Sequence, residues 1–160
     1  MACLLKGGGG LYNRLSLGAV VLAAGQGSRL GHRPKSLIEL AGIPLIRRQL
    51  IALSGAGVDQ LVVVLGHYAT QIRPFIEDFP ITVVDLSDHP EASQKLSVQQ
   101  GVSALQGKFD AVMVVPSDMP LLGTADYTDL IGAYKKRPEG ARMVRPIVSE
   151  SLGNPVIFDY

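Results

Sequence analysis

Six short apolar runs, separated by helical patterns, constrain the fold of this chain more than any other feature of its sequence. Each run is nearly continuous in apolar residues, which is typical of strands buried on both faces of a parallel sheet. The runs are Ala19–Ala23, Leu61–Leu65, Ile81–Val84, Ala111–Val115, Met143–Val148 and Pro155–Phe158.

Helical patterns lie between these runs. In Pro44–Leu53 apolar residues recur at helical spacing, and Pro44 suits the first turn of a helix. Three further segments have helical character: Ala69–Phe79, which Pro74 interrupts, Ser93–Leu105, and Thr124–Tyr134, with Thr124 as its cap. The alternation predicts a doubly wound α/β sheet, whose ligands bind beyond the carboxyl ends of its strands.

The composition argues against several classes of protein. With 160 residues the chain fits one domain, and its 15 basic and 14 acidic side chains form no long basic run, which argues against nucleic-acid binding by charge. The only cysteine, Cys3, excludes a disulfide framework and a thiolate metal cluster. No apolar run reaches the roughly 18 residues that a membrane span requires. We therefore expect a cytoplasmic protein without a membrane partner.

The amino-terminal segment differs from the rest of the chain. Gly7–Gly10 cannot pack a core, and the apolar stretch before it is too short for a secretory signal. We expect a disordered leader over residues 1–16 and one folded domain over residues 17–160.

A glycine-rich loop follows the first apolar run, and cations follow the glycines. Gly25 and Gly27 let backbone N–H groups approach phosphate oxygens, while Arg29 and Lys35 would neutralise their charge. A Walker A loop needs glycine directly before its lysine, but Pro34 stands there. The glycines at 25, 27 and 31 also miss the G-x-G-x-x-G spacing of a dinucleotide fingerprint. An ordinary glycine-rich connection with solvated cations is the alternative.

Four ordered motifs give this loop a family resemblance that spans most of the chain. They are Leu22-Ala23-Ala24-Gly25, Pro34-Lys35-Ser36-Leu37, Pro116-Ser117-Asp118-Met119-Pro120-Leu121 and Gly153-Asn154-Pro155-Val156. Together they resemble the MobA-like NTP transferases, and among these they are most similar to the molybdenum cofactor cytidylyltransferases. The resemblance implies a Rossmann-like nucleotide-diphospho-sugar transferase (GT-A-like) fold, apparently truncated at the carboxyl terminus. In this family a first motif of the form LAAG, rather than LAGG, goes with cytosine rather than guanine, so the resemblance implies that CTP rather than GTP is the nucleotide substrate.

The resemblance also assigns residues. Those it places in nucleotide binding are Leu22, Ala23, Ala24, Gly25, Gly27, Arg29, Lys35, Gln94 and Ser97. Arg29, Lys35 and Asp118 would be catalytic, with Asp118 holding Mg²⁺, and Asn154 would face the acceptor.

For several residues a purely structural role is an alternative to a role in the site. Asp118 also fits a turn that precedes Met119. Asp85 is a possible second acidic contact and His67 a possible neighbour of the site, although a surface or capping role suits each at least as well.

We expect an enzyme that moves a nucleoside monophosphate, CMP from CTP, onto molybdopterin and releases pyrophosphate. A molybdoenzyme or its chaperone would be a protein partner. One alternative changes the reaction, to guanylyl transfer or to a sugar or alcohol phosphate acceptor. Another is a nucleotide-binding domain without turnover, because the chain ends at Tyr160 whereas related enzymes continue with a further acidic segment.

Overall fold

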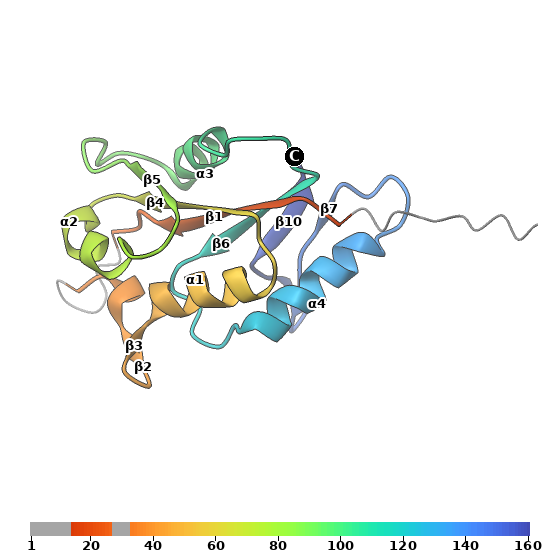
Figure 1. The fold of residues 1–160 in the computed structure, drawn as a ribbon, viewed down its shortest axis with the longest axis horizontal. Helices are drawn as coiled ribbons and strands as arrows, with labels where there is room; N and C mark the ends of the chain where they lie inside the picture. The colour runs from red at the N-terminus through yellow and green to blue at the C-terminus, as the bar shows by residue number, and fades with distance from the viewer. Residues whose placement is uncertain (1–13, 27–32) are drawn as a thin grey trace, which may run out of the picture.

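The computed structural model describes residues 14–26 and 33–160, and its centre is a six-stranded sheet in the order β5-β4-β1-β6-β10-β7 (Figure 1). The strands are β1 (Leu17–Ala23), β4 (Gln60–Leu65), β5 (Thr82–Asp85), β6 (Ala111–Pro116), β7 (Met143–Val144) and β10 (Val156–Asp159). Neighbours among β5, β4, β1 and β6 are parallel, whereas β10 runs antiparallel to both β6 and β7. The prediction of a doubly wound, mostly parallel sheet is confirmed.

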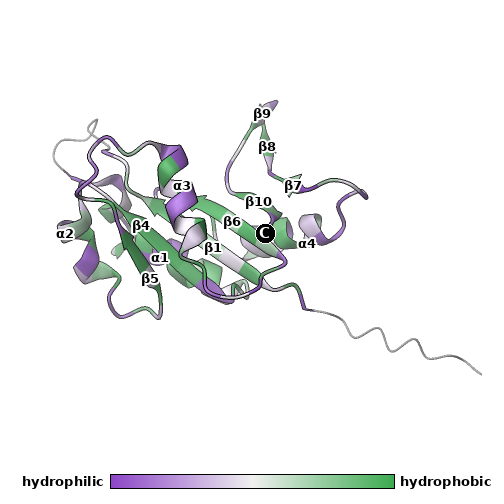
Figure 2. Ribbon diagram, turned by 90° about the horizontal axis from the view of Figure 1, so that it is seen from above, coloured by the Kyte–Doolittle hydropathy of each residue, from purple (hydrophilic) through white to green (hydrophobic). Residues whose placement is uncertain are grey.

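Helices cover both faces of this sheet. On one face α1 (Leu45–Gly55) packs beside α4 (Thr124–Lys135), and α3 (Gln94–Ser103) covers the other face (Figure 1). The remaining elements are short: η1 (Lys35–Leu37), the hairpin β2 (Glu39–Leu40)–β3 (Ile43–Pro44), α2 (Ala69–Ile72), η2 (Arg73–Phe75), and the hairpin β8 (Ile147–Val148)–β9 (Ser151–Leu152). Figure 2 shows the β8–β9 hairpin projecting away from the sheet. Among the described residues, no helix is long and apolar enough to cross a membrane.

Successive side chains of β1 point to opposite faces and divide the core into two parts. Ala19 and Val21 pack in the cluster that α1 and α4 close, whereas Val20 packs with Val62 and Val64 under α3. Because the side chains of a strand alternate between faces, a sheet covered on both sides needs apolar residues at every position. This explains why the predicted runs are continuous rather than alternating.

The expectations for the last two strands need correction. Met143–Val148 is not one strand, because β7 ends at Val144 and Ile147 begins the separate β8–β9 hairpin. Pro155–Phe158 forms a strand, as β10, but it is antiparallel to β6. A parallel return from β7 would need a crossover of a dozen or more residues, usually helical, and the connection here holds only a hairpin.

Helix starts also differ from the sequence interpretation. Pro44 precedes α1 instead of lying in its first turn. Thr124 is the first residue of α4, and its expected capping role belongs to Asp126, whose carboxylate accepts from the Gly123 N–H at 2.8 Å. The expected interruption by Pro74 is confirmed, because α2 ends at Ile72 and the proline lies in η2.

The expected leader lies mostly outside the described residues. Arg14 is described and donates to the Asp59 carboxylate at 2.8 Å, and the Ser16 N–H donates to the Asp110 carboxylate at 2.8 Å. The chain therefore makes defined contacts just before β1, and the extent of a leader stays a prediction.

Helix α3 approaches the sheet closely at Gly101. A Cβ there would lie 2.3 Å from Val20 Cγ1 and 2.9 Å from Val64 Cγ2. We expect Gly101→Ala to destabilise the protein by about 1–3 kcal/mol, because the extra methyl overpacks a filled core. Urea unfolding of the variant would measure this change.

Gly132→Ala is the matched control, since Gly132 lies within α4 and a Cβ there would meet nothing within 4 Å. It should be neutral or stabilise by up to about 1 kcal/mol, the difference in helix propensity. Equal effects of the two substitutions would contradict the close packing of α3.

Candidate functional site

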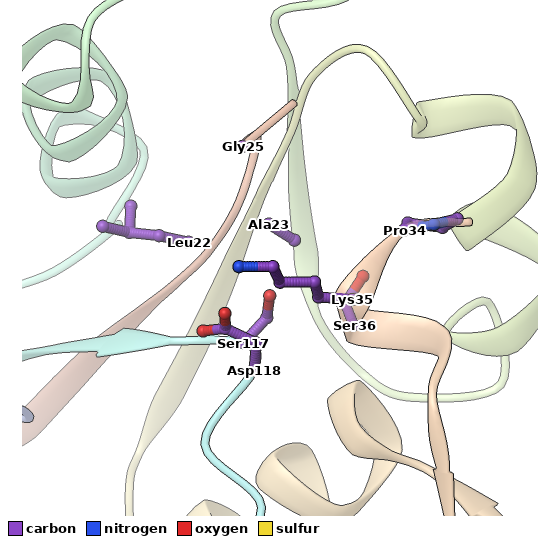
Figure 3. Close-up of a pocket in the computed structure, with 8 residues that line it drawn as sticks. All are labelled: Leu22, Ala23, Gly25, Pro34, Lys35, Ser36, Ser117 and Asp118. Carbon is purple, nitrogen blue, oxygen red and sulfur yellow. The ribbon is translucent and has the colours of Figure 1, made fainter. Parts of the chain in front are cut away.

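Residues from three distant segments meet at the carboxyl end of β1. A pocket of about 180 Å³ is lined by Leu22, Ala23, Gly25, Pro34, Lys35, Ser36, Ser117 and Asp118 (Figure 3). The predicted nucleotide residues at the end of β1 are thus brought together with Lys35 and Asp118. The parallel register accounts for this, since it places Leu22 opposite Pro116 and both strands leave the sheet at the same edge.

Local backbone bonds hold the walls of this pocket. The Ser117 N–H donates to the Leu22 carbonyl at 3.0 Å, which extends the pairing of β1 and β6 by one residue and sets the position of Asp118. On the other wall, η1 is closed by the Leu37 N–H, which donates to the Pro34 carbonyl at 3.0 Å. From η1 the Lys35 side chain extends across the pocket toward the wall formed by Ser117 and Asp118 (Figure 3).

The charges in this pocket suit a phosphate ligand and a cation. Lys35 supplies an ammonium group, and Asp118 supplies a carboxylate at the opposite wall. Ser36 and Ser117 add hydroxyl groups, and both residues are buried. Lysine binds phosphate as a point charge, and carboxylate oxygens are hard ligands of the kind that Mg²⁺ prefers.

A second pocket adjoins the first on the α3 side of β1. It has a volume of about 250 Å³ and is lined by Leu22, Ala24, Gly25, Ala92, Gln94, Ser97 and Pro116. Gln94 and Ser97 therefore lie next to the LAAG segment, and their contact with a nucleotide stays a prediction. Because Leu22 and Gly25 line both pockets, the two form one extended site with a charged part and a more apolar part.

Of the predicted site residues, two fall in a stretch that the structure does not describe, and one lines another pocket. Gly27 and Arg29 fall within 27–32, outside the described residues. Asn154 lines a different pocket of about 420 Å³, beside α4 and next to Met119. The structure thus separates Asn154 from Lys35 and Asp118, although Met119 follows Asp118 directly in the chain.

The carboxylate of Asp85 makes hydrogen bonds outside the two pockets. Its carboxylate accepts from the Ser87 N–H at 2.9 Å and from the Arg73 guanidinium at 2.7 Å. These hydrogen bonds, from Ser87 first and then from Arg73, lower the pKa of Asp85 to about 2. Asp85 therefore ties the end of β5 to η2 rather than completing the acidic site.

His67 lies near the extended site but not in its two main pockets. It lines a smaller pocket of about 120 Å³ together with Gly25, Gln26 and His89. Within the described residues no group of three or more His, Cys, Asp or Glu side chains could hold a metal ion by itself.

Sequence reasoning missed the contribution of two buried polar residues. Ser36 lines the charged pocket, and Gln49, on α1, is fully buried behind the loop that carries Asp118. A signal for Gln49 was present, because an amide falls on the inward face of α1, among the buried apolar residues Ile46, Leu50 and Leu53.

The hydrogen bonds that Asp85 accepts from Ser87 and Arg73 predict a pH dependence of stability. A carboxylate whose pKa is lowered by folding stabilises the protein above its ordinary pKa near 4, and this contribution disappears as the pH falls toward 2. We expect Asp85→Asn to cost roughly 0.5–1 kcal/mol at pH 7, because both partners are partly solvated, and progressively less below pH 4. Urea unfolding at several pH values would test this. Glu139→Gln, which alters an exposed carboxylate, is the control and should leave the free energy of unfolding at pH 7 near the wild-type value.

Comparison with known proteins identifies the domain. The family model described as the MobA-like NTP transferase domain matches residues 19–160. Among relatives, the bifunctional protein GlmU of Kineococcus radiotolerans is 34% identical over 137 residues, which are 84% of this chain and 28% of that protein. GlmU of a Chelativorans species is 35% identical over 152 residues, 89% of this chain and 32% of that protein. The chain spans about a third or less of these relatives.

Solved structures show the same fold. Rv0371c from Mycobacterium tuberculosis superposes with a TM-score of 0.77 at 23% identity, covering 91% of this chain and 72% of that one. A nucleotidyl transferase from Methanothermobacter thermautotroptrophicus gives a TM-score of 0.73 at 27% identity, covering 90% and 71%. The family match covers both pockets and all of the sheet except Leu17 and Gly18 of β1, and the chain therefore belongs to the MobA-like NTP transferase domain family.

Proposed function

We propose that this chain catalyses nucleotidyl transfer, in which a phosphate oxygen of an acceptor attacks the α-phosphorus of a nucleoside triphosphate and pyrophosphate leaves. The observation that carries the proposal is the placement of Lys35, Asp118 and Gly25 around one pocket beside a second pocket lined by Gln94 and Ser97. The first suits a polyphosphate with its cation, and the second suits a nucleoside. Membership of an NTP transferase family supports the same reaction class.

In this proposal each residue acts by position and charge, because phosphoryl chemistry of this kind needs little covalent help from the protein. The Gly25 backbone holds the nucleotide, and Lys35 neutralises charge on the triphosphate and on the leaving pyrophosphate. Arg29, outside the described residues, is proposed to share that task.

Asp118 is proposed to hold the divalent cation. One carboxylate with substrate phosphates is a sufficient ligand set for Mg²⁺, which usually keeps several waters. A bound divalent cation would stabilise the charge that develops on the transferring phosphoryl group. A manganese complex has been solved for Rv0371c, whose chain is 22% identical to this one, and it supports a divalent ion in this fold.

The finer identity of donor and acceptor rests on the sequence motifs. We propose CTP as the donor because Ala24 of the LAAG motif lines the nucleoside pocket. We propose molybdopterin as the acceptor, with Asn154 on its side of the molecule and a molybdoenzyme or its chaperone as a protein partner. The two GlmU relatives are not named as molybdenum cofactor enzymes, which leaves a sugar or alcohol phosphate acceptor as the alternative.

Removal of either charged group should abolish turnover. We expect Lys35→Ala and Asp118→Ala each to lower kcat for pyrophosphate release by at least about 100-fold, because each removes charge stabilisation from the transition state. The measurement is pyrophosphate release from CTP with molybdopterin, and with a sugar phosphate in parallel. Normal turnover in either variant would overturn the assignment.

Lys108→Ala is the matched control, since Lys108 is exposed near the opposite end of the sheet, before β6 begins. It should leave turnover unchanged. Calorimetric titration with CTP and Mg²⁺ covers the remaining case, because binding without pyrophosphate release would indicate a nucleotide-binding domain.

Base preference should depend on Ala24. Replacing its methyl group by hydrogen enlarges the nucleoside pocket, so Ala24→Gly should raise the kcat/KM ratio of GTP to CTP by about 10-fold. Steady-state kinetics with both nucleotides would measure the ratio. An unchanged ratio would show that the LAAG motif does not select the base in this chain.

A further inference from the structure

The side chain of Gln49 connects α1 to the loop that carries Asp118. Gln49 is fully buried, although its neighbours on the inward face of α1 are the aliphatic Ile46, Leu50 and Leu53. Burying an amide without partners is costly, so both of its polar groups need hydrogen bonds. The Nε2 group donates to the Met119 carbonyl, and Oε1 accepts from the Tyr127 hydroxyl.

The partners determine which way the amide points. A carbonyl oxygen can only accept, so the group facing Met119 must be the NH₂ end of Gln49. Its oxygen then faces Tyr127, which must donate. Burial, and then the nearby Asp126 carboxylate, raises the pKa of Tyr127 well above its usual range, so its hydroxyl keeps the proton that it donates.

These bonds fix the turn on both sides of Asp118. On one side the Ser117 N–H donates to the Leu22 carbonyl at 3.0 Å, and on the other the Met119 carbonyl accepts from Gln49. Asp118 lies between these two anchored residues and lines the charged pocket (Figure 3). Of the two anchors, only the second depends on a side chain and can be removed by substitution.

We propose that Gln49 is a positioning residue, whose buried amide holds the Ser117–Met119 turn so that the Asp118 carboxylate meets the cation of a bound metal–nucleotide complex. The proposal rests on the proposed function, in which Asp118 holds that cation. Partners of this kind, which orient a metal ligand from behind, typically contribute 10–100-fold to metal affinity.

The test compares the binding of a metal–nucleotide complex with that of the free nucleotide. Isothermal titration calorimetry would measure dissociation constants for manganese–CTP, and for CTP with EDTA. Gln49→Met keeps the length of the side chain and removes its hydrogen bonds. We expect it to raise the dissociation constant of manganese–CTP by about 10-fold, and to leave that of metal-free CTP within about twofold. General damage to the fold would weaken both.

Two further variants distinguish the hydrogen bond of Gln49 to Met119 from its hydrogen bond to Tyr127. Gln49→Asn keeps an amide but is one methylene too short to reach both partners, so it should reproduce the metal-specific loss and serves if Gln49→Met does not fold. Tyr127→Phe removes the other hydrogen bond of the same amide and leaves the bond to Met119, so both constants should stay near the wild-type values.

Asp118→Asn distinguishes failure of this inference from failure of the proposed function. If it weakens manganese–CTP binding while the Gln49 variants do not, Gln49 has no positioning role and the proposed function stands. If Tyr127→Phe weakens binding as much as Gln49→Met does, local packing rather than the bond to Met119 is responsible, and the inference is wrong. If Asp118→Asn binds both forms like the wild type, or the wild type binds neither, the proposed function fails and the role of Gln49 with it.

Discussion

The parallel pairing of β1 with β6 is the constraint on which the rest of the structure depends. It sets Leu22 opposite Pro116, so the segments that follow both strands emerge side by side at one edge of the sheet. The Ser117 N–H then donates to the Leu22 carbonyl, which carries the pairing into the site itself. Slippage of this register would separate Gly25 from Asp118 and remove the pocket. The positions of the site residues therefore follow from backbone hydrogen bonds in the core.

Parallel pairing has a second consequence, for the composition of the core. A sheet covered by α1 and α4 on one face and by α3 on the other leaves no solvated side for polar residues. Among the described residues, the buried polar side chains are Ser36, Gln49, Ser97 and Ser117. The three serines line the two pockets, and Gln49 holds the loop behind one of them. Buried polarity in this protein is thus concentrated where the sheet ends and the candidate site begins.

Much of the fold and part of the site could be predicted from local patterns. The strands β1, β4 and β6 were visible as continuous apolar runs, and the carboxyl ends of parallel strands had to meet at one edge. Asp118 could therefore be expected to lie beside the glycine-rich loop that follows β1. The orientation of β10 could not be predicted, because an apolar run has no direction and the connection before it resembles any other loop. The division of Met143–Val148 into two separate strands could not be predicted either, because both strands are apolar.

The sequence by itself determined the kinds of residue available: apolar runs that must be buried, glycines that let the backbone approach a phosphate, and charges of the sign that a metal-bound triphosphate requires. These properties belong to single residues and short spacings, so they can be recognised in the sequence without knowledge of the fold. Only the tertiary structure decided which of those residues meet. In the folded protein Asn154 lines a separate pocket, and the Asp85 carboxylate accepts a hydrogen bond from Arg73. The amide of Gln49 lies behind the loop that carries Asp118. Each of these outcomes depends on contacts between elements far apart in the chain, which local spacing does not encode.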